Sequence, residues 1–522
     1  MEMVGAAGRY TALAEDREPF LQRARESAEI SIPALMPPEG HTGTQEMRNP
    51  WQSIVASGIN HLAAKLLVVL FPIGSPFFRL TLDDFVKEEL MARAGGGAEG
   101  EDARAEFERA LNKVERAVAN RMEQRGARTP LYESLRQQIV AGNCLLETLK
   151  GGGLKMHRMD SYVVQRDVEG EPLEIILKRT VAKGSAPPEV REILSRSTAE
   201  YGEDSRKDVD IYTWAKRDGK TWRSHQETCG VRIEGTEGSW PVDKPRLLAL
   251  RWTALPGEHY GRGLIEEHAG DIYSVESLTE SVVDLAAISA KTLFFVDETG
   301  TTSRAAVARA KNGAVLKGRA EDVSVLRVEK LADLQVAAGQ LDKLERRLDR
   351  VFLRASSIQR DAERVTAEEL RIMAAELEAS HGGTYSLLAK ELQLPLATRV
   401  MADMQASGDL PPLPKEAVSP QIVAGLEALG RHSDLTRLDQ LVGGLKELFG
   451  EQAISEWINV EAYVMRRATA LGVDADGLTR TAEEVQQSRQ QAAMQQMATA
   501  AAPNAVRAMA QQEPQEQNEQ PA

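Results

Sequence analysis

The sequence predicts a mainly helical α+β fold that is divided into several domains. Three observations support this prediction: a length of 522 residues, long stretches with apolar residues at helical spacing, and one stretch where the apolar period changes to two. A single hydrophobic core stops growing at roughly 250–300 residues. Aromatic residues make up only 5% of the chain while apolar residues make up 42%, which favours helices packed through aliphatic side chains.

The N-terminal part, up to Gly142, is predicted to be helical. A first helix is expected over residues 14–35, ending at the prolines 33, 37 and 38, and a second over Trp51–Phe71, whose dense apolar content indicates burial on most sides. Thr129-Pro130 is predicted to start a later helix, with threonine as the N-cap and proline at the first position. Between them a further helix has one apolar stripe, formed by Phe107, Leu111, Val114, Val118 and Met122.

Residues 143–253 are predicted to form an antiparallel sheet, because apolar residues alternate there. Two strands, 162–166 and 173–177, flank a Glu-Gly-Glu-Pro turn, and two more, 211–214 and 221–223, flank Asp218-Gly219. Asp-Gly between alternating residues is a strong hairpin signal.

Beyond Gly263 the chain is predicted to be helical again for about thirty residues. Residues 293–330 interrupt the helices, with a hairpin expected at Asn312-Gly313. A second long helix follows over 331–353, where three leucines recur every seven residues and form a coiled-coil-like seam: Leu334, Leu341 and Leu348.

A charged link, Gln359–Arg371, joins this helix to the next. Thr366 and Glu369 have the spacing of a capping box, which fixes a helix start and suggests a part of an assembly rather than an enzyme. The helix is expected over 366–393, relaxed at His381 and stopped near Pro395. Short helices are expected from 411 to 471 and one helix over 479–511, followed by a disordered tail at 512–522.

The composition argues against several classes of protein. A net charge of −14 argues against a tight grip on nucleic acid through phosphate neutralisation, but it is compatible with a surface past which DNA slides. Two cysteines give no disulfide framework. The first residues lack the regions of a signal peptide, and Leu62–Phe71 is far shorter than the roughly 20 residues of a membrane span, so no membrane insertion is expected.

No catalytic, cofactor-binding or metal site is predicted. Gly219-Lys220-Thr221 resembles the end of a phosphate loop, but the earlier glycine is replaced by Trp214 and the segment lies in a hairpin. His259 and His268 flank two glutamates without the spacing of a metal-ligand pair. Gly261-Arg262-Gly263 is interpreted as a turn that enters a helix.

Several segments, in family order, resemble podoviral head-to-tail connectors, the portal proteins of the autographivirus-like kind. Each segment is weakly specific, but the collinear set is specific and covers most of the chain. The segments are Pro50-Trp51-Gln52, Leu62–Leu66, Leu70-Phe71-Pro72, Val140–Asn143, Ser161–Asp167, Tyr260–Arg262, Ile265–Glu267, Arg364–Glu369, Glu391–Leu396 and Pro414–Val418.

The resemblance implies a dodecameric ring at one capsid vertex, with a channel for packaging and ejection of double-stranded DNA. It implies docking of the terminase large subunit, the tail adaptor, and the scaffold, major capsid and internal core proteins, within virions assembled in the host cytoplasm. The implied layout is a wing at 1–265, stem helices at 266–292 and 331–353 around a clip at 293–330, a wing and channel segment at 354–410, a crown at 411–475, and a barrel helix with tail at 476–522. The alternative is another ring-forming virion protein, a tail adaptor or an internal core protein.

Three groups of residues are candidates for function under this resemblance. Arg360 and Arg364 either pair with acidic neighbours or face the channel and contact DNA. The three leucines of the seam are assigned to stem packing. Between Thr299 and Ala320 five cations occur without an acidic residue, and they form either a solvated hairpin or a contact surface: Arg304, Arg309, Lys311, Lys317 and Arg319. The 479–511 helix is either a mobile tail or part of a barrel.

Overall fold

A computed structural model describes the following residues: 5–41, 43–73, 76–82, 98–149, 151–201, 208–289, 293–326, 331–354, 367–411, 418–422, 439–450 and 463. The chain divides into two compact units, Met1–Ala428 and Leu429–Ala522. Arg360, Arg364 and the 476–522 segment lie outside the described residues. Among the helices that are described, none combines the length and the apolar character that a membrane crossing requires.

The N-terminal helices form the first layer of the larger unit. Helix α1 (Ala6–Glu29) begins earlier than the sequence predicts and ends before the short turn η1 (Pro33–Leu35). The predicted start was wrong. The N–H of Ala6, which has no partner within the helix, donates to the Glu227 carboxylate at 2.6 Å, and this partner lies 221 residues away, where local sequence patterns cannot indicate it. Helix α2 (Ile54–Leu70) agrees with the prediction, and Ile59 and Leu62 on it are fully buried.

Helices α4 (Ala98–Gln124) and α5 (Arg128–Ala141) follow. The apolar stripe on α4 is confirmed, since four of its five members, Leu111 to Met122, are buried. The predicted cap of α5 was wrong: the helix begins at Arg128, so Thr129 and Pro130 already stand in its first turn, where proline's missing N–H costs nothing. Gly142 ends α5 in the left-handed region, with φ 73°.

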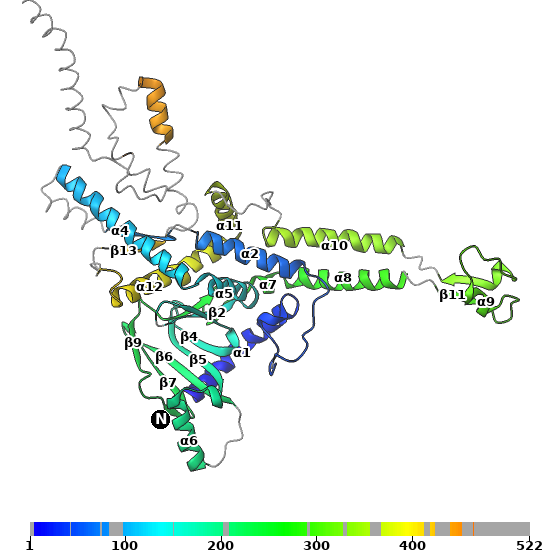
Figure 1. Ribbon diagram of the computed structural model, residues 1–522, viewed down its shortest axis with the longest axis horizontal. Helices are drawn as coiled ribbons and strands as arrows, with labels where there is room; N and C mark the ends of the chain where they lie inside the picture. The colour runs from blue at the N-terminus through cyan, green and yellow to red at the C-terminus, as the bar shows by residue number, and fades with distance from the viewer. Residues whose placement is uncertain are drawn as a thin grey trace, which may run out of the picture. The chain divides into compact units, whose positions relative to one another are not determined.

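Two antiparallel sheets follow these helices in the chain, and Figure 1 shows the larger one below α2 and α5. In the smaller one, β2 (Asn143–Thr148) lies between β3 (Leu154–His157) and β10 (Leu247–Arg251). The larger sheet confirms both predicted hairpins. It contains β4 (Tyr162–Arg166), β5 (Pro172–Ala182), β6 (Asp208–Asp218), β7 (Thr221–Thr228), β8 (Val231–Arg232) and β9 (Gly238–Pro241).

Helices cover the larger sheet in two places. Tyr10 and Leu13 of α1 pack against Val163 and Ile176 of β4 and β5. Helix α6 (Pro188–Tyr201) contributes Val190 to a second cluster with the start of β6. The short turns η2 (Met159–Ser161) and η3 (Lys183–Ser185) connect these elements.

A helical hairpin follows the sheets. After α7 (Leu264–Glu267), α8 (Ala269–Ser289) runs beside α10 (Leu331–Val351), as Figure 1 shows. Both long helices agree with the prediction. The segment between them contains β11 (Leu293–Val296), α9 (Arg304–Arg309), the turn η4 (Ala320–Asp322) and β12 (Val323–Leu326).

The hairpin predicted at Asn312-Gly313 was wrong. Gly313 does have a positive φ of 82°, so the turn itself is present. The strands that pair are β11 and β12, with Leu293 opposite Leu326, and the turn lies in the long loop between them. Turn chemistry is local, whereas the choice of strand partner depends on the apolar residues at the ends of the segment.

The last two helices of the larger unit are joined by a π-helix. Helix α11 (Ala367–Leu388) begins where the capping box predicts and departs from helical geometry at His381, also as predicted. The expected stop near Pro395 was wrong. A π-helix, η5 (Ala389–Gln393), leads directly into α12 (Leu394–Ala406), so Pro395 stands in the first turn of a new helix.

The described residues beyond 411 form one strand and one helical stretch. Strand β13 (Val418–Ile422) pairs with β1 (Phe78–Leu82), so the expectation of helix was wrong at these positions. In the smaller unit, residues 439–450 are helical, and the Tyr463 hydroxyl donates to Asp439.

Candidate functional site: a charged junction and a basic tip

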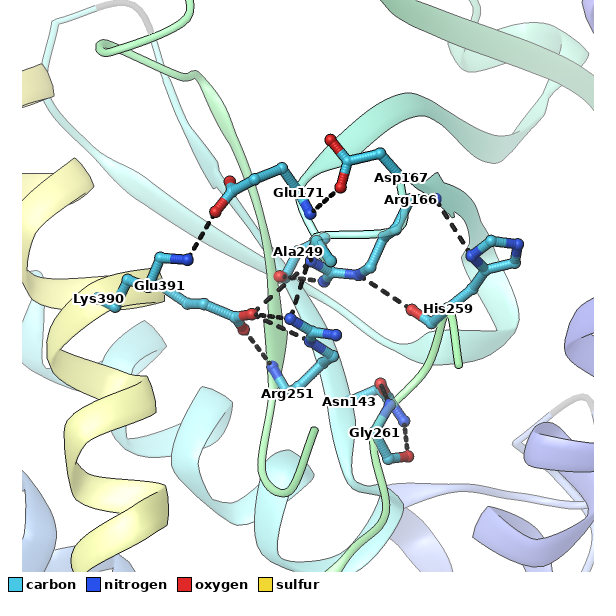
Figure 2. Close-up of polar contacts among 11 residues, drawn as sticks. Asn143, Arg166, Asp167, Glu171, Ala249, Arg251, His259, Gly261, Lys390 and Glu391 are labelled. Atoms are coloured by element: carbon cyan, nitrogen blue, oxygen red, sulfur yellow. Dashed lines mark hydrogen bonds and ion pairs between the residues drawn. The ribbon is translucent and has the colours of Figure 1, made fainter. Parts of the chain in front are cut away.

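A charged junction forms where β4, β10 and the π-helix η5 meet. We define the junction cluster as Arg166, Glu171, Arg251, Lys390 and Glu391. Arg166 and Arg251 end their strands, and Lys390 and Glu391 lie on η5. π-Turns occur frequently at functional sites. Figure 2 shows the five side chains converging from these elements.

Glu391 is the centre of the junction cluster. Its carboxylate accepts hydrogen bonds from Arg251 Nη2 at 2.5 Å, Arg251 Nε at 3.0 Å and the Arg251 backbone N–H at 3.0 Å. Arg166 Nη1 lies 3.7 Å from the same carboxylate. The side chains of Arg166, Arg251 and Glu391 are only 2%, 8% and 12% exposed, so this is a buried arrangement of two cations around one anion.

Backbone carbonyls complete the environment of Arg166. The guanidinium donates to the carbonyls of His259, Gly170 and Ala249 at 3.0, 2.8 and 2.7 Å. Burial lowers the pKa of the Arg166 guanidinium from its ordinary value, and the nearby Glu391 opposes this shift. The buried charge is therefore fully satisfied, and it ties the loop before β5 to β10 (Figure 2).

The outer pair of the junction cluster is more exposed. Lys390 Nζ lies 2.7 Å from Glu171 Oε1, and the two side chains are 66% and 43% exposed. A cavity of about 420 Å³ adjoins the cluster, lined also by Trp222 and Leu247. The members of the cluster that line this cavity are Arg166, Glu171, Lys390 and Glu391, and each of them contacts an oppositely charged member of the cluster.

A second contact fixes the end of α5 close to the junction cluster. Asn143 Nδ2 donates to the Gly261 carbonyl and Gly261 N–H donates to Asn143 Oδ1, both at 2.7 Å. A Cβ atom at Gly261 would lie 2.7 Å from the Thr253 carbonyl oxygen, so only glycine allows this approach. The Tyr260 hydroxyl also accepts the N–H of Val164 at 3.0 Å.

These contacts explain four of the segments on which the resemblance rests. These four segments are remote in sequence and meet at the junction cluster. They are Val140–Asn143, Ser161–Asp167, Tyr260–Arg262 and Glu391–Leu396. The sequence pointed to Arg166 and Glu391 as parts of motifs. It did not point to Arg251, whose only signal is a charge at the end of a buried apolar strand.

Helix α2 anchors the helical hairpin. Lys65 Nζ lies 2.6 Å from Glu376 of α11 and 3.5 Å from the carbonyl of Leu353, just after α10. The backbone N–H groups of Trp51 and Gln52 donate to the Glu276 carboxylate of α8 at 2.9 and 3.3 Å. The signal for Lys65 was present in the sequence as one charge inside an apolar run.

The structure places the predicted packing leucines on α10. Leu348 is fully buried and Leu341 is half-buried, while the side chain of Leu334 lies outside the description. Arg347 of α10 pairs with Asp271 of α8 at 2.9 Å.

The segment between α8 and α10, residues 293–326, is called the tip segment. All five of its predicted contact residues are exposed: Arg304, Arg309, Lys311, Lys317 and Arg319. Arg304 and Arg309 bound the short helix α9. The acidic residues at the base of the segment serve internal contacts, since Asp297 accepts from Thr299 and Asp322 accepts from Thr302.

The segments considered for catalysis have structural roles. Gly219-Lys220-Thr221 lies at the β6–β7 turn, as predicted. His259 Nδ1 accepts the N–H of Arg166 at 3.2 Å. Gly263 precedes α7, which confirms the helix-entry turn. Within the described part of the chain, no cluster of three or more histidine, cysteine or acidic side chains is arranged to hold a metal ion.

Comparison with known proteins identifies the class to which this fold and junction belong. Residues 5–478 match the family described as bacteriophage head to tail connecting protein. The chain therefore belongs to that family, and the resemblance seen in its motifs is confirmed together with the portal function that it implied.

The relatives are named portal proteins. The portal protein of Escherichia phage T7 is 36% identical over 496 residues, covering 94% of this chain and 91% of the relative. The portal protein of Enterobacteria phage T3 is 37% identical over 495 residues, with 94% and 91% covered. Among solved structures, a chain in the virion of a native gene transfer agent particle is similar at 11% identity and a TM-score of 0.34, covering 77% of this chain and 88% of that one.

Proposed function

We propose that this chain is the non-enzymatic subunit of a dodecameric portal ring. The ring occupies one vertex of the capsid in the virion, is assembled in the host cytoplasm, and forms the channel through which double-stranded DNA is packaged and ejected. The observation that carries this proposal is membership of the connector family over residues 5–478, with relatives named portal proteins.

The helical hairpin supports assembly from copies of the chain. In one copy, several apolar side chains on α8 and α10 are exposed, among them Val283, Ile288 and Val336. Apolar side chains that are exposed on the helices of one copy leave water when another chain packs against them, which stabilises an assembly. Neighbouring copies in a ring supply such a chain without a further protein.

The regions have these proposed roles. Residues 1–265 and 354–410 form the wing and the wall of the channel, 266–292 and 331–353 the stem, and 293–330 the clip. The crown is at 411–475 and the barrel helix with its tail at 476–522, where internal core proteins bind. The scaffold and major capsid proteins are further partners of the ring. The terminase large subunit and later the tail adaptor dock on the basic tip segment.

The first experiment is negative-stain electron microscopy of the purified protein, with native mass measurement alongside. We expect rings of about a dozen subunits with a central channel, the number that the family resemblance implies. A monomer or dimer under conditions that permit assembly would contradict the portal ring and favour an adaptor or core protein. Replacement of Leu341 by glutamine is expected to reduce ring formation, because a polar group buried without a partner costs about 1–3 kcal/mol per subunit.

We further propose that Arg360 or Arg364 faces the channel and contacts DNA. Both belong to the charged link between α10 and α11. Particles that carry Arg364→Ala are expected to lose packaged DNA more readily than wild-type particles. Equal DNA retention in the two would contradict this role.

A further inference from the structure

Helix α10 ends in a turn, residues 352–354, that we call the end turn. The N–H of Leu353 donates to the Arg350 carbonyl at 3.1 Å, and the N–H of Arg354 donates to the Asp349 carbonyl at 2.7 Å. These are the two hydrogen bonds of a Schellman motif, whose left-handed position is usually taken by glycine. Here that position is Leu353, with a φ of 54°. Because this conformation crowds the Cβ atom against the following carbonyl, the end turn is strained.

One face of α2 holds the end turn in place. This α2 face is formed by Gly58, His61 and Lys65, whose spacing puts them on one side of the helix. The Phe352 ring is fully buried against Gly58, where a Cβ atom would lie 2.4 Å from the ring. Lys65 Nζ and the His61 ring both approach the carbonyl of Leu353, the lysine at 3.5 Å.

The polar contacts of the α2 face with the end turn are weak. A distance of 3.5 Å is long for a hydrogen bond, and Lys65 Nζ lies closer, at 2.6 Å, to the Glu376 carboxylate. His61 Nε2 is buried and has no hydrogen-bond partner among the residues that the structure describes. A buried polar atom without a partner costs free energy. The contacts that oppose the strain are therefore small themselves.

An ordinary helical turn is the alternative to the strained one. If Leu353 were right-handed, its N–H would donate to the Asp349 carbonyl and the N–H of Arg354 to the Arg350 carbonyl, as in an α-helix. The two donors would only exchange their two acceptors, so α10 would lose no hydrogen bond. What favours the left-handed state is therefore the α2 face, which covers Phe352 and brings cationic groups to the Leu353 carbonyl.

We propose that the end turn has two backbone states: the α2 face holds Leu353 left-handed, and release of that face lets α10 continue as a right-handed helix through Arg354. The chain then leaves α10 in a different direction. This inference goes beyond the proposed function, because the contacts that carry it lie within one copy of the chain and involve neither DNA nor a partner protein.

Glycine and alanine at position 353 distinguish the two states, because they rank in opposite orders in them. In a left-handed position glycine is favoured, since it has no Cβ atom. Inside a right-handed helix alanine is favoured. Leu353→Gly and Leu353→Ala both lose the packing of the leucine side chain, so a comparison between them reports mainly the backbone state.

The comparison is made in the full-length assembled protein, with the α2 face intact and with it disrupted. Lys65→Met removes the cation and keeps an extended side chain. Gly58→Ala displaces the Phe352 ring while it raises the helix propensity of α2. Ser57→Ala is the matched control, because Ser57 is next to Gly58 in α2 but is exposed in one copy.

Hydrogen–deuterium exchange of the amides of residues 352–354 measures the balance. In the wild-type and Ser57→Ala backgrounds we expect the glycine variant to be protected about fivefold or more above the alanine variant. In the Lys65→Met and Gly58→Ala backgrounds we expect the order to reverse, with alanine about twofold to fivefold above glycine.

The amides of Ile59 and Leu62 show whether α2 itself remains folded in each variant. A disrupted background that keeps their protection decides the question, and two such backgrounds are available. If glycine remains the better protected residue in that background, the end turn stays left-handed without the α2 face and the two-state inference is refuted. If alanine is better protected in the wild-type background, the left-handed state is itself refuted.

Discussion

Replacement of Glu391 by glutamine tests whether the junction cluster holds the sheets to the last helices. The substitution keeps the size of the side chain and removes the one anion between Arg166 and Arg251. Both guanidiniums are more than nine-tenths buried. Their other partners are backbone carbonyls, among them Ala249 for Arg166 and Gly170 for Arg251. Removal of one partner from a buried ion pair costs about 3–5 kcal/mol, because the remaining charge is left uncompensated.

A neighbouring substitution on the same π-turn provides the control. Lys390→Met breaks the exposed pair with Glu171, for which a cost of only about 0–1 kcal/mol is expected. The two variants therefore alter adjacent residues of η5 and differ mainly in the burial of the broken contact.

Hydrogen–deuterium exchange on the assembled protein measures the difference locally. Each loss of about 1.4 kcal/mol in local stability lowers protection about tenfold, so Glu391→Gln is expected to lower the protection of β4 and β10 amides by a hundredfold or more. Lys390→Met is expected to change it by less than about fivefold. Equal protection in the two variants would refute the assignment of Glu391 as the centre of the cluster.

Three further predictions concern the rest of the larger unit. Lys65→Met is expected to destabilise the joint with Glu376 by about 1–3 kcal/mol, lowering the urea midpoint, and an unchanged midpoint would argue that the contact is dispensable. Leu348→Ala removes a fully buried side chain and is expected to cost about 2–5 kcal/mol in the same measurement; a cost below about 1 kcal/mol would show that the site collapses around the gap. Burial raises the pKa of the Cys144 thiol to about 12, so a thiol reagent at pH 8 is expected to label exposed Cys229 at once and Cys144 only after unfolding. Because the unfolded thiol ionises from about pH 9 and the folded thiol does not, stability is expected to fall as pH rises through that window; early labelling of both thiols would contradict the burial.

Local patterns in the sequence predicted the parts of the fold that depend on neighbouring residues. The change to period two located the larger sheet, and Asp218-Gly219 located the β6–β7 turn, because a two-residue hairpin specifies its own register. The long helices α8 and α10 followed from apolar spacing alone. The motifs between 50 and 418 were sufficient to place the chain in its family.

The parts that depend on remote partners were not predictable in this way. The start of α1 depends on Glu227, and the pairing of β11 with β12 spans a loop that itself contains a good turn. Motif analysis named Arg166 and Glu391 without showing that they meet, and it missed Arg251 altogether. The sequence of β10 alone does not predict that the carboxylate of Glu391 will bind Arg251 at the end of this strand.

The convergence of distant segments in the junction cluster restricts how this protein can be recombined with its relatives. Asn143 exchanges two hydrogen bonds with Gly261, and Arg251 binds Glu391, so any crossover point between positions 143 and 391 separates at least one of these partners. When a block of one parent replaces part of the other within that interval, the two residues of a pair come from the same parent only if the block contains both of them or neither of them. Crossovers before residue 65 or after residue 391 keep this set and the Lys65–Glu376 pair together, so hybrid connectors joined there are expected to fold more readily than those joined inside the interval.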